Sequence, residues 1–291
     1  MEFLLSEDIW VIGSGVVGQA TAALLELVQI DATLVDVDEA LIHELTRLGR
    51  RAVLRPEAES GCVIAFLCVP TPEDKLSGFN LDAVYASINS VLRIAGVKKI
   101  IFVLRSTVLP GTCSDMLNGF IKTNLQSGCE AELVYMPEFV RQAKWQEDAI
   151  EPRAIVLGSE SKLALNRLKQ LFSIFSDRIM TFNDPHDAEM IKIVHNAYNA
   201  SKISFWNEMY RIGQVRAINM DLISKAVSIT AEASWNSEYG IKGGAPFEGA
   251  CLPKDLAAFI FHAEQSGIHP RILRAIRDVN ESERQLREPV A

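Results

Sequence analysis

The most reactive side chain that the sequence offers is a cysteine in a glycine-containing loop. Cys251 lies in the segment Phe247–Asp255, and Lys254 and Asp255 follow it closely. The thiolate is the nucleophilic form of cysteine, and nearby positive charge favours it. The segment therefore predicts an activated thiol. The alternative is a buried structural cysteine, because most free cysteines belong to cores.

A lysine and an asparagine at helical spacing form a second candidate. Lys192 and Asn196 are four residues apart in a segment with helical periodicity, so they share one face of the helix. An ammonium and an amide side by side can hold a substrate oxygen and stabilise the negative charge that develops on it. The alternative for such a pair is a solvated surface.

A glycine-rich turn, GSGVVG, provides a place for phosphate groups. It follows the apolar run Ile9–Ile12 and leads directly into a helical pattern. The first glycine permits a tight turn, the second lets the backbone approach a pyrophosphate, and the third lets the helix pack closely. The candidate cofactor residues of this turn are Gly13, Gly15, Val16, Val17 and Gly18.

Asp36 stands at the end of the next predicted strand. A carboxylate in that position accepts hydrogen bonds from ribose hydroxyls and repels the 2′-phosphate of NADP. Strand, glycine turn, helix and carboxylate together predict a site for NAD. A glycine-rich turn in a nucleotide-free α/β protein is the alternative.

Two threonines follow later strands. Thr71 and Thr107 come after apolar runs whose carboxyl ends line the ligand crevice of a doubly wound fold. We expect their hydroxyls to touch the cofactor or the reacting centre, although either residue alone is more typical of an ordinary turn.

The elements that must position these residues alternate through the first half of the chain. Short β-rich runs, several of them continuously apolar, alternate with helical stretches such as Gly18–Val28 and Leu81–Ile94. This pattern is typical of βαβ units around a parallel sheet. The predicted strands are Ile9–Ile12, Thr33–Val35, Val63–Val69, Ile100–Leu104, Leu133–Tyr135 and Ala154–Leu157.

The character of the chain changes near Asp187. Strand signals nearly vanish, Ala188–Ile218 predicts one long helix, and further helices follow around the glycine- and proline-rich stretch Tyr239–Pro253. The turn residues Asn183-Asp184-Pro185 mark the boundary. The sequence therefore predicts an α/β fold, with a Rossmann domain containing a doubly wound parallel sheet over residues 1–185. An all-helical second domain is predicted over residues 186–291.

Composition excludes several classes of protein. A formal net charge of −8 disfavours binding to nucleic acid, which needs a basic face, although a small anionic substrate needs only local cations. The five cysteines include no CxxC pair, which argues against a disulfide framework or a zinc ribbon, so we expect no metal and a reducing cytoplasm. No apolar run is long enough to span a membrane, and the first residues do not resemble a signal peptide.

Six segments together resemble the UDP-glucose/GDP-mannose dehydrogenase family, which oxidises nucleotide-sugar alcohols to acids. In chain order they are GSGVVG, CVPTP, RSTVLPGT, MPEFVR, EMIKIVHNAYNASKISFWNE and CLPKD. The resemblance covers nearly the whole chain. It implies two successive hydride transfers from a primary alcohol, sugar or sugar-like, to NAD. Between them Cys251 captures the aldehyde as a thiohemiacetal, whose oxidation gives a thioester that water hydrolyses to the acid.

The resemblance also implies the supporting roles. Lys192 and Asn196 would stabilise the alkoxide and oxyanion, and Lys192 would also shuttle a proton. The residues implied to handle water and proton transfer are Thr107, Glu138 and Asp255. Cofactor contacts beyond the glycine turn and Asp36 are implied for Thr71, Thr107, Gln142 and Lys254. Substrate contacts are implied for Glu138, Lys192, Asn196, Glu248 and Gly249. The helical second domain resembles the family's dimerisation region, so we expect a homodimer.

The sequence departs from the family in three places. It ends at Ala291, before the third domain that usually grips the nucleotide. We expect either a shortened relative or a fragment of a longer protein, and the altered site residues favour the first. Gln142 replaces a usual glutamate and cannot act as a base. Glu248 replaces a glycine that lets the backbone approach the sugar, adding bulk and negative charge. We therefore expect weak activity on UDP-glucose and GDP-mannose, and a substrate that is smaller or held differently.

Two other functions remain open. A single two-electron oxidation or reduction, as in β-hydroxyacid dehydrogenases, would use a Lys-xxx-Asn helix but would not need Cys251. A non-catalytic NAD-binding or oligomerisation module would need none of these side chains. Thr107, Lys192, Asn196, Cys251 and Asp255 occur together in this chain, which argues against such a module.

Overall fold

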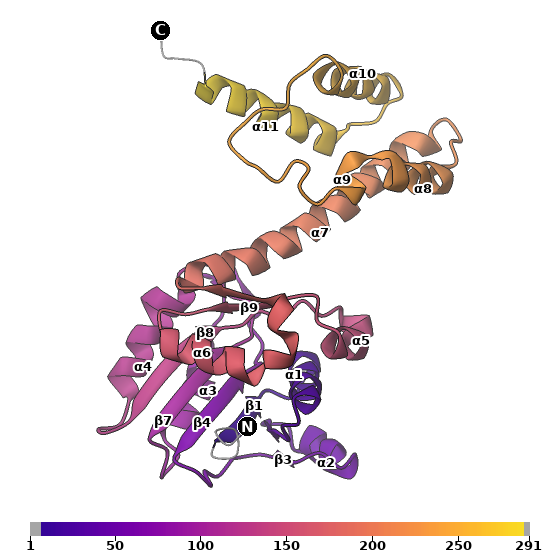
Figure 1. Cartoon of the computed structure of the whole chain (residues 1–291). Helices are drawn as coiled ribbons and strands as arrows, with labels where there is room; N and C mark the ends of the chain where they lie inside the picture. The colour runs from indigo at the N-terminus through magenta and orange to yellow at the C-terminus, as the bar shows by residue number, and fades with distance from the viewer. Residues whose placement is uncertain (1–6, 288–291) are drawn as a thin grey trace. The chain divides into compact units, whose positions relative to one another are not determined.

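The computed structural model describes residues 7–287 and divides into two compact units between His195 and Asn196 (Figure 1). The division falls within one long helix, α7 (Pro185–Gln214). This helix begins at the turn where the sequence predicts a domain boundary.

The first unit is built on an eight-stranded sheet with the order β10-β9-β8-β7-β4-β1-β2-β3. Its strands are β1 (Asp8–Ile12), β2 (Thr33–Val35), β3 (Ala52–Val53), β4 (Cys62–Leu67), β7 (Lys99–Leu104), β8 (Glu130–Tyr135), β9 (Ile155–Gly158) and β10 (Ile179–Phe182). A separate small hairpin pairs β5 (Glu73–Asp74) with β6 (Gly78–Phe79). All pairings in the large sheet are parallel except the one between β8 and β9, which is antiparallel.

Helices cover both faces of this sheet, which confirms the predicted Rossmann-type architecture (Figure 1). One core layer packs the sheet against α3 (Asp82–Leu92) and α4 (Asn118–Asn124), and includes Ile88, Phe102 and Ile121. The other packs it against α1 (Val16–Leu27) and α6 (Lys162–Leu171), and includes Leu25, Phe66 and Leu165. The remaining helical segments of this unit are α2 (Glu39–Arg47), η2 (Thr112–Leu117), η3 (Gln142–Lys144), α5 (Trp145–Ile150) and η4 (Ser173–Arg178).

The continuously apolar runs form the buried central strands. β4 lies between β1 and β7, and Val63 to Leu67 are buried, as expected for a strand covered on both faces. The predicted strand Val63–Val69 ends two residues early, at Leu67. Its last two residues begin the loop that leads to Pro70.

Helices are the regular secondary structure of the second unit within its described residues, and a long loop over residues 236–251 separates two of them. After the end of α7 it contains α8 (Met220–Thr230), α9 (Glu232–Trp235), α10 (Leu252–Gln265) and α11 (Arg271–Arg287). Its small core contains Met209, Ile212, Ile260, Ala263 and Leu273. Between residues 7 and 287, no helix is both long and apolar enough to cross a membrane.

Candidate active site

The glycine turn is tightly packed at both of its ends. Gly13 has a φ of +89°, and its N–H donates to the Val35 carbonyl at 2.8 Å. A Cβ on Gly13 would lie 2.8 Å from the Cys68 carbonyl oxygen, and one on Gly18 would lie 2.0 Å from the Gly13 oxygen. Only glycine therefore lets the start of α1 approach the ends of β1 and β4 so closely.

The middle of the same turn is open. Gly15 is exposed in extended backbone at the N-terminus of α1, and a Cβ there would have no neighbour within 4 Å. Val16 and Val17 form the first turn of α1, which contains no acidic side chain. Open space in front of a helix N-terminus fits an incoming diphosphate.

Asp36 lies directly beside this turn. Its Oδ2 accepts a hydrogen bond from the Ser14 N–H at 2.6 Å, and its Oδ1 accepts one from the Asp38 N–H at 3.1 Å. The carboxylate is thereby held at the end of β2 with both oxygens oriented. The glycine turn and Asp36 together fit a dinucleotide whose ribose hydroxyls would donate to Asp36.

The loops after β4 and β7 are joined by hydroxyl groups. Thr71 Oγ1 donates to the Thr107 carbonyl at 2.7 Å, and Ser106 Oγ donates to the Val69 carbonyl at 2.6 Å. The two predicted threonines therefore meet at one edge of the sheet. The Thr71 hydroxyl braces the loop through this bond and keeps its acceptor lone pairs. Sequence reasoning did not identify the buried Ser106, which makes the matching bond.

Lys192 and Glu138 form a buried ion pair. The Lys192 Nζ donates to Glu138 Oε1 at 2.9 Å and to the Glu138 carbonyl oxygen at 2.6 Å. Their side chains are only 5% and 14% exposed. Glu138 Oε2 accepts the Val140 N–H at 2.7 Å, so the carboxylate is fixed from both sides. An ammonium held in this way can also donate to a substrate oxygen.

Two aromatic rings adjoin this pair. The Lys192 Nζ lies 5.6 Å from the centre of the Phe139 ring, and the His195 ring packs against Phe139 with centroids 4.9 Å apart. Gln142 begins η3 in the same stretch of chain and is exposed. The sequence analysis did not single out Phe139 or His195. The one signal for His195 is its position three residues after Lys192 on the same helix.

A buried carboxylate anchors the helix that carries Lys192. Glu189 Oε2 accepts the Gly111 N–H at 2.6 Å, and Oε1 accepts the Cys113 N–H at 2.8 Å. Burial raises the pKa of Glu189, and the two backbone donors only partly oppose the shift. Glu189 thus connects α7 to the RSTVLPGT segment, another contact that the sequence did not reveal.

The cysteine segment belongs to the second unit. Cys251 is exposed at the N-cap of α10, so this thiol lies outside the core, unlike the buried Cys113. Lys254 and Asp255 lie on the first turn of α10, with 3.0 Å between Nζ and Oδ1, and both are exposed. Positive charge at a helix N-terminus favours a nearby anion.

The loop before Cys251 is fixed from α11. Asn280, which is buried, accepts the Phe247 N–H at 2.6 Å and donates to the Phe247 carbonyl at 3.2 Å. Gly249 has a φ of +90°, a conformation that favours glycine, whereas its neighbour Glu248 exposes its side chain. Asn196, the first residue of the second unit, is also exposed. Asn280 is a further positioning residue that the sequence did not reveal.

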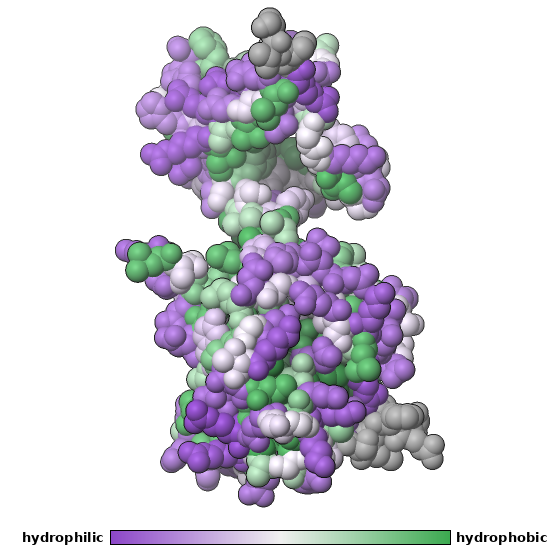
Figure 2. All heavy atoms as spheres, turned by 90° about the vertical axis from the view of Figure 1, so that its left-hand side faces the viewer, coloured by the Kyte–Doolittle hydropathy of each residue, from purple (hydrophilic) through white to green (hydrophobic). Residues whose placement is uncertain are grey.

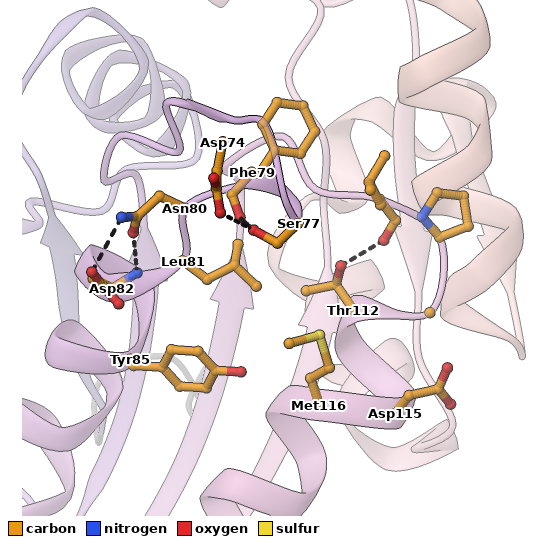
Figure 3. A pocket seen from close by; sticks show the side chains of 13 residues that line it. Asp74, Ser77, Phe79, Asn80, Leu81, Asp82, Tyr85, Thr112, Asp115 and Met116 are labelled. Carbon is orange, nitrogen blue, oxygen red and sulfur yellow. Dashed lines mark hydrogen bonds between the residues drawn. The ribbon is translucent and has the colours of Figure 1, made fainter.

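A pocket of about 570 Å³ lies in the first unit between the β5–β6 hairpin, the start of α3 and the turn around Gly111 (Figure 3). Three aspartates line it, Asp74, Asp82 and Asp115, and the Tyr85 hydroxyl points toward Met116 across it. None of the predicted site residues lines this pocket. It shares only the end of the RSTVLPGT segment with the candidate site.

Two domain families match the chain. Residues 55–176 match the NAD binding domain of the UDP-glucose/GDP-mannose dehydrogenase family, and residues 186–282 match its central domain. UDP-glucose 6-dehydrogenase of Haloferax volcanii is 30% identical over 95% of this chain and 70% of its own length. GDP-mannose 6-dehydrogenase of Pseudomonas savastanoi is 27% identical over 94% and 68%.

Solved structures share the fold. GDP-mannose dehydrogenase of Pseudomonas aeruginosa, solved as a ternary complex, superposes with a TM-score of 0.80 at 23% identity, covering 95% of this chain and 69% of that one. UDP-glucose dehydrogenase of Pyrobaculum islandicum gives a TM-score of 0.69 at 26% identity, covering 95% and 68%. The chain spans 65 to 70% of the length of the first two curated relatives. With both of its domains matched in order, the chain belongs to the UDP-glucose/GDP-mannose dehydrogenase family.

Proposed function

We propose that this protein is an NAD-dependent oxidoreductase that oxidises a primary alcohol, on a sugar or a sugar-like molecule, to the acid. The observation that carries the proposal is the buried Lys192–Glu138 pair, in the same unit as the glycine turn. A desolvated ammonium aimed by a carboxylate is a strong stabiliser of a developing alkoxide. Family membership supports the same reaction class.

The cofactor would be held by the glycine turn and Asp36. The backbone around Gly15 would receive the diphosphate, and Asp36 would accept hydrogen bonds from the adenosine ribose. Thr107, Gln142 and Lys254 are proposed to complete the site. NAD, when bound, supplies the acceptor for the hydride.

The chain's own groups would manage charge and protons. The Lys192 ammonium and the Asn196 amide would donate to the substrate oxygen. Thr107, Glu138 and Asp255 would orient water and transfer protons. Holding substrate and water in fixed positions accounts for much of the rate gain in such reactions.

Cys251 would make the second oxidation possible. Its thiolate adds to the aldehyde carbon, and the carbonyl oxygen takes a proton, which gives a thiohemiacetal. The thiohemiacetal carbon then loses a hydride to a second NAD, and its hydroxyl loses a proton, which gives a thioester. Water then breaks the C–S bond and releases acid and thiol. The position of Cys251 at the N-terminus of the 14-residue helix α10 supports this role, because that helix end favours the thiolate.

The substrate is proposed to differ from those of the named relatives. The exposed carboxylate of Glu248 lies three residues before Cys251 and would repel an anionic diphosphate sugar. We therefore expect weak activity on UDP-glucose and GDP-mannose, and turnover of a smaller or differently charged alcohol.

The number of NADH molecules formed per substrate consumed tests the proposal. Purified protein is incubated with NAD and a panel of nucleotide sugars, sugar phosphates and hydroxy acids, and NADH is measured per substrate consumed. Two NADH per substrate are expected, and Cys251→Ser should abolish acid formation while leaving NAD affinity within about twofold. The exposed Cys251 can be exchanged for serine without disturbing a core.

Other outcomes separate the competing functions. One NADH per substrate, unaffected by Cys251→Ser, would assign a single two-electron oxidation. NAD binding without turnover of any alcohol would assign a non-catalytic module. Cys62→Ser is the matched control, since this partly exposed thiol begins β4, at the opposite end of that strand from the loop that contains Thr71.

The proposal also includes a homodimer as the oligomeric state and the cytoplasm as the cellular location. Apolar side chains on the helices of the second unit are exposed, and hydrophobic patches appear on its surface in Figure 2. These faces support a homodimer. All five cysteines are free thiols, which supports a reducing compartment such as the cytoplasm.

A further inference from the structure

The second unit buries two polar side chains among its described residues, Glu208 on α7 and Asn280 on α11. Burying a polar group costs free energy unless its hydrogen bonds to water are replaced within the protein. An apolar side chain would fill either place without that cost. Both side chains bond to backbone groups of other segments, a pattern typical of residues that fix one part of a chain against another.

Glu208 fixes the start of α11 against α7. Its Oε1 accepts the Ile272 N–H at 3.0 Å, and its Oε2 accepts the Leu273 N–H at 3.1 Å. Both N–H groups belong to the first turn of α11, where a helix offers no acceptor of its own. Ile212 of α7 and Leu273 of α11 also belong to the same apolar core. The helix α11 is therefore anchored on α7, the helix that carries Asn196.

Asn280 extends this connection to the loop of the cysteine. It lies two turns after Leu273 on α11, where its Oδ1 accepts the Phe247 N–H at 2.6 Å and its Nδ2 donates to the Phe247 carbonyl at 3.2 Å. One amide thus holds both backbone groups of one residue, which fixes the orientation of that residue as well as its place. Cys251 follows four residues later, and the residues 248–250 between them are exposed.

The other side of Cys251 is held by α10, which also packs on α11. The Cys251 carbonyl accepts the Asp255 N–H at 2.9 Å as α10 begins. Ile260 and Ala263 of α10 share the apolar core with Leu273 of α11. Contacts with α11 therefore fix the chain on both sides of the thiol. This precision matters for a nucleophile, because a misplacement of about 1 Å can lower a rate by ~10²-fold.

We propose that Asn280 is a positioning residue for the thiol step and that Glu208 anchors it on α7, an inference that rests on the proposed function. In that function the first hydride transfer does not involve Cys251, whereas the second follows addition of its thiolate to the aldehyde carbon. Asn280 touches no reacting atom and acts through Phe247. Without this tether the first oxidation continues, and the aldehyde leaves before the thiol captures it.

The tether itself can be tested without turnover. Asn280→Asp keeps the shape of the side chain and an acceptor for the Phe247 N–H, but it places an oxygen against the Phe247 carbonyl. Hydrogen exchange of the peptide 244–251, followed by mass spectrometry without cofactor, should be ~10-fold faster in this variant, the value of about one lost hydrogen bond. Equal exchange in wild type and Asn280→Asp overturns the proposal.

Asn219→Asp is the matched control. Asn219 is exposed and caps α8 by accepting the Leu222 N–H, a role that aspartate fills equally well. The same amide-to-carboxylate change in the same unit should therefore leave the exchange of the peptide 244–251 as in wild type.

The second test separates the two oxidations. The substrate panel is turned over in the presence of semicarbazide, which traps free aldehyde, and NADH, acid and trapped aldehyde are measured. Asn280→Asp should lower acid formation by ~10²-fold and bring the yield toward one NADH per substrate, with aldehyde in the trap. The rate of the first hydride transfer should stay within about twofold, and the KM for NAD should not change. Glu208→Gln should shift the yield in the same direction, and Asn219→Asp should behave as wild type.

The results distinguish this inference from the proposed function. Two NADH per substrate from Asn280→Asp at the wild-type rate removes Asn280 from the thiol step and leaves the oxidoreductase intact. An equal loss of both hydride transfers in a folded variant also overturns the inference, because the role would then not be specific to the thiol. One NADH per substrate from the wild type, or no turnover, overturns both. Asn280→Ser removes the amide without adding a charge and decides the outcome if the aspartate variant does not fold.

Discussion

Asp36 is the single residue on which cofactor choice depends. Its carboxylate is held by the Ser14 and Asp38 N–H groups beside the glycine turn. A carboxylate in that place should repel the additional phosphate of NADP. We expect wild type to bind NAD more tightly than NADP, and Asp36→Ala to weaken NAD binding by ~10–100-fold, the value of one or two charge-assisted hydrogen bonds. Titrations with both cofactors measure this.

Asp38 offers a matched control two residues away. Its Oδ1 caps α2 by accepting the Ala40 and Leu41 N–H groups, and its side chain is exposed. Asp38→Ala should cost about 1 kcal/mol of unfolding free energy and leave the NAD/NADP preference unchanged. Equal or tighter NADP binding by the wild type would contradict the role given to Asp36.

Residues were predictable where the signal is local. Gly13, Gly18 and Asp36 follow from a short motif in its strand–turn–helix context, and the packing agrees. The Lys192–Glu138 contact joins residues 54 positions apart, so no spacing rule reveals it, and only the family resemblance suggested both residues. Asn280 lies in none of the six motifs. Its role comes from side chains that meet only after folding.

Among the elements, α7 matters most because it carries the proposed site residues Lys192 and Asn196. Glu189 connects this helix to the turn after β7 through two backbone donors, Gly111 and Cys113. A glutamine there keeps one acceptor oxygen and turns an NH₂ group against a backbone N–H. We expect Glu189→Gln to lower the unfolding free energy by about 1–3 kcal/mol at pH 7. Urea denaturation measures this.

The difference in unfolding free energy between wild type and Glu189→Gln should also change with pH, in a direction that the pKa of Glu189 sets. Burial raises the folded-state pKa of Glu189 above its ordinary value of 4.5, so the folded state binds the proton more tightly than the unfolded state. The contribution of Glu189 is therefore largest in acid and declines as pH rises through the window above 4.5. The gap between wild type and Glu189→Gln should narrow over that window.

Long apolar runs predicted the central elements well. The strands at the middle of the sheet and the helices α1, α3 and α7 lie where periodicity places them, within a few residues. The two-residue strand β3 and the hairpin strands are too short to show a period. β10 was missed because it is an edge strand with half-exposed side chains, and the antiparallel β8–β9 pairing depends on tertiary packing.

At the scale of the whole molecule, the second unit leaves much apolar surface uncovered. Ile203 on α7, Leu222 on α8 and Ile229 on α8 are 64%, 66% and 68% exposed. The hydrophobic core cluster of this unit, by contrast, is small and consists of Met209, Ile212, Ile260, Ala263 and Leu273 among its described residues. Exposed apolar faces of this kind mark interaction sites.

A second copy of the chain is the partner that we expect to cover this surface. A stable dimer buries about 1,200 Å² or more, and adjacent helices with exposed isoleucine and leucine can supply such an area. Sedimentation velocity at ~10 μM should therefore show a dimer. Ile203→Glu or Leu222→Glu should shift the population to monomer, because a carboxylate would be desolvated at the interface. NAD binding should remain, because the glycine turn and Asp36 lie in the first unit. Leu163→Glu on α6 changes a similarly exposed leucine, at 70%, and should leave the dimer intact. A monomeric wild type, or equal dissociation by Leu163→Glu, would contradict this assignment.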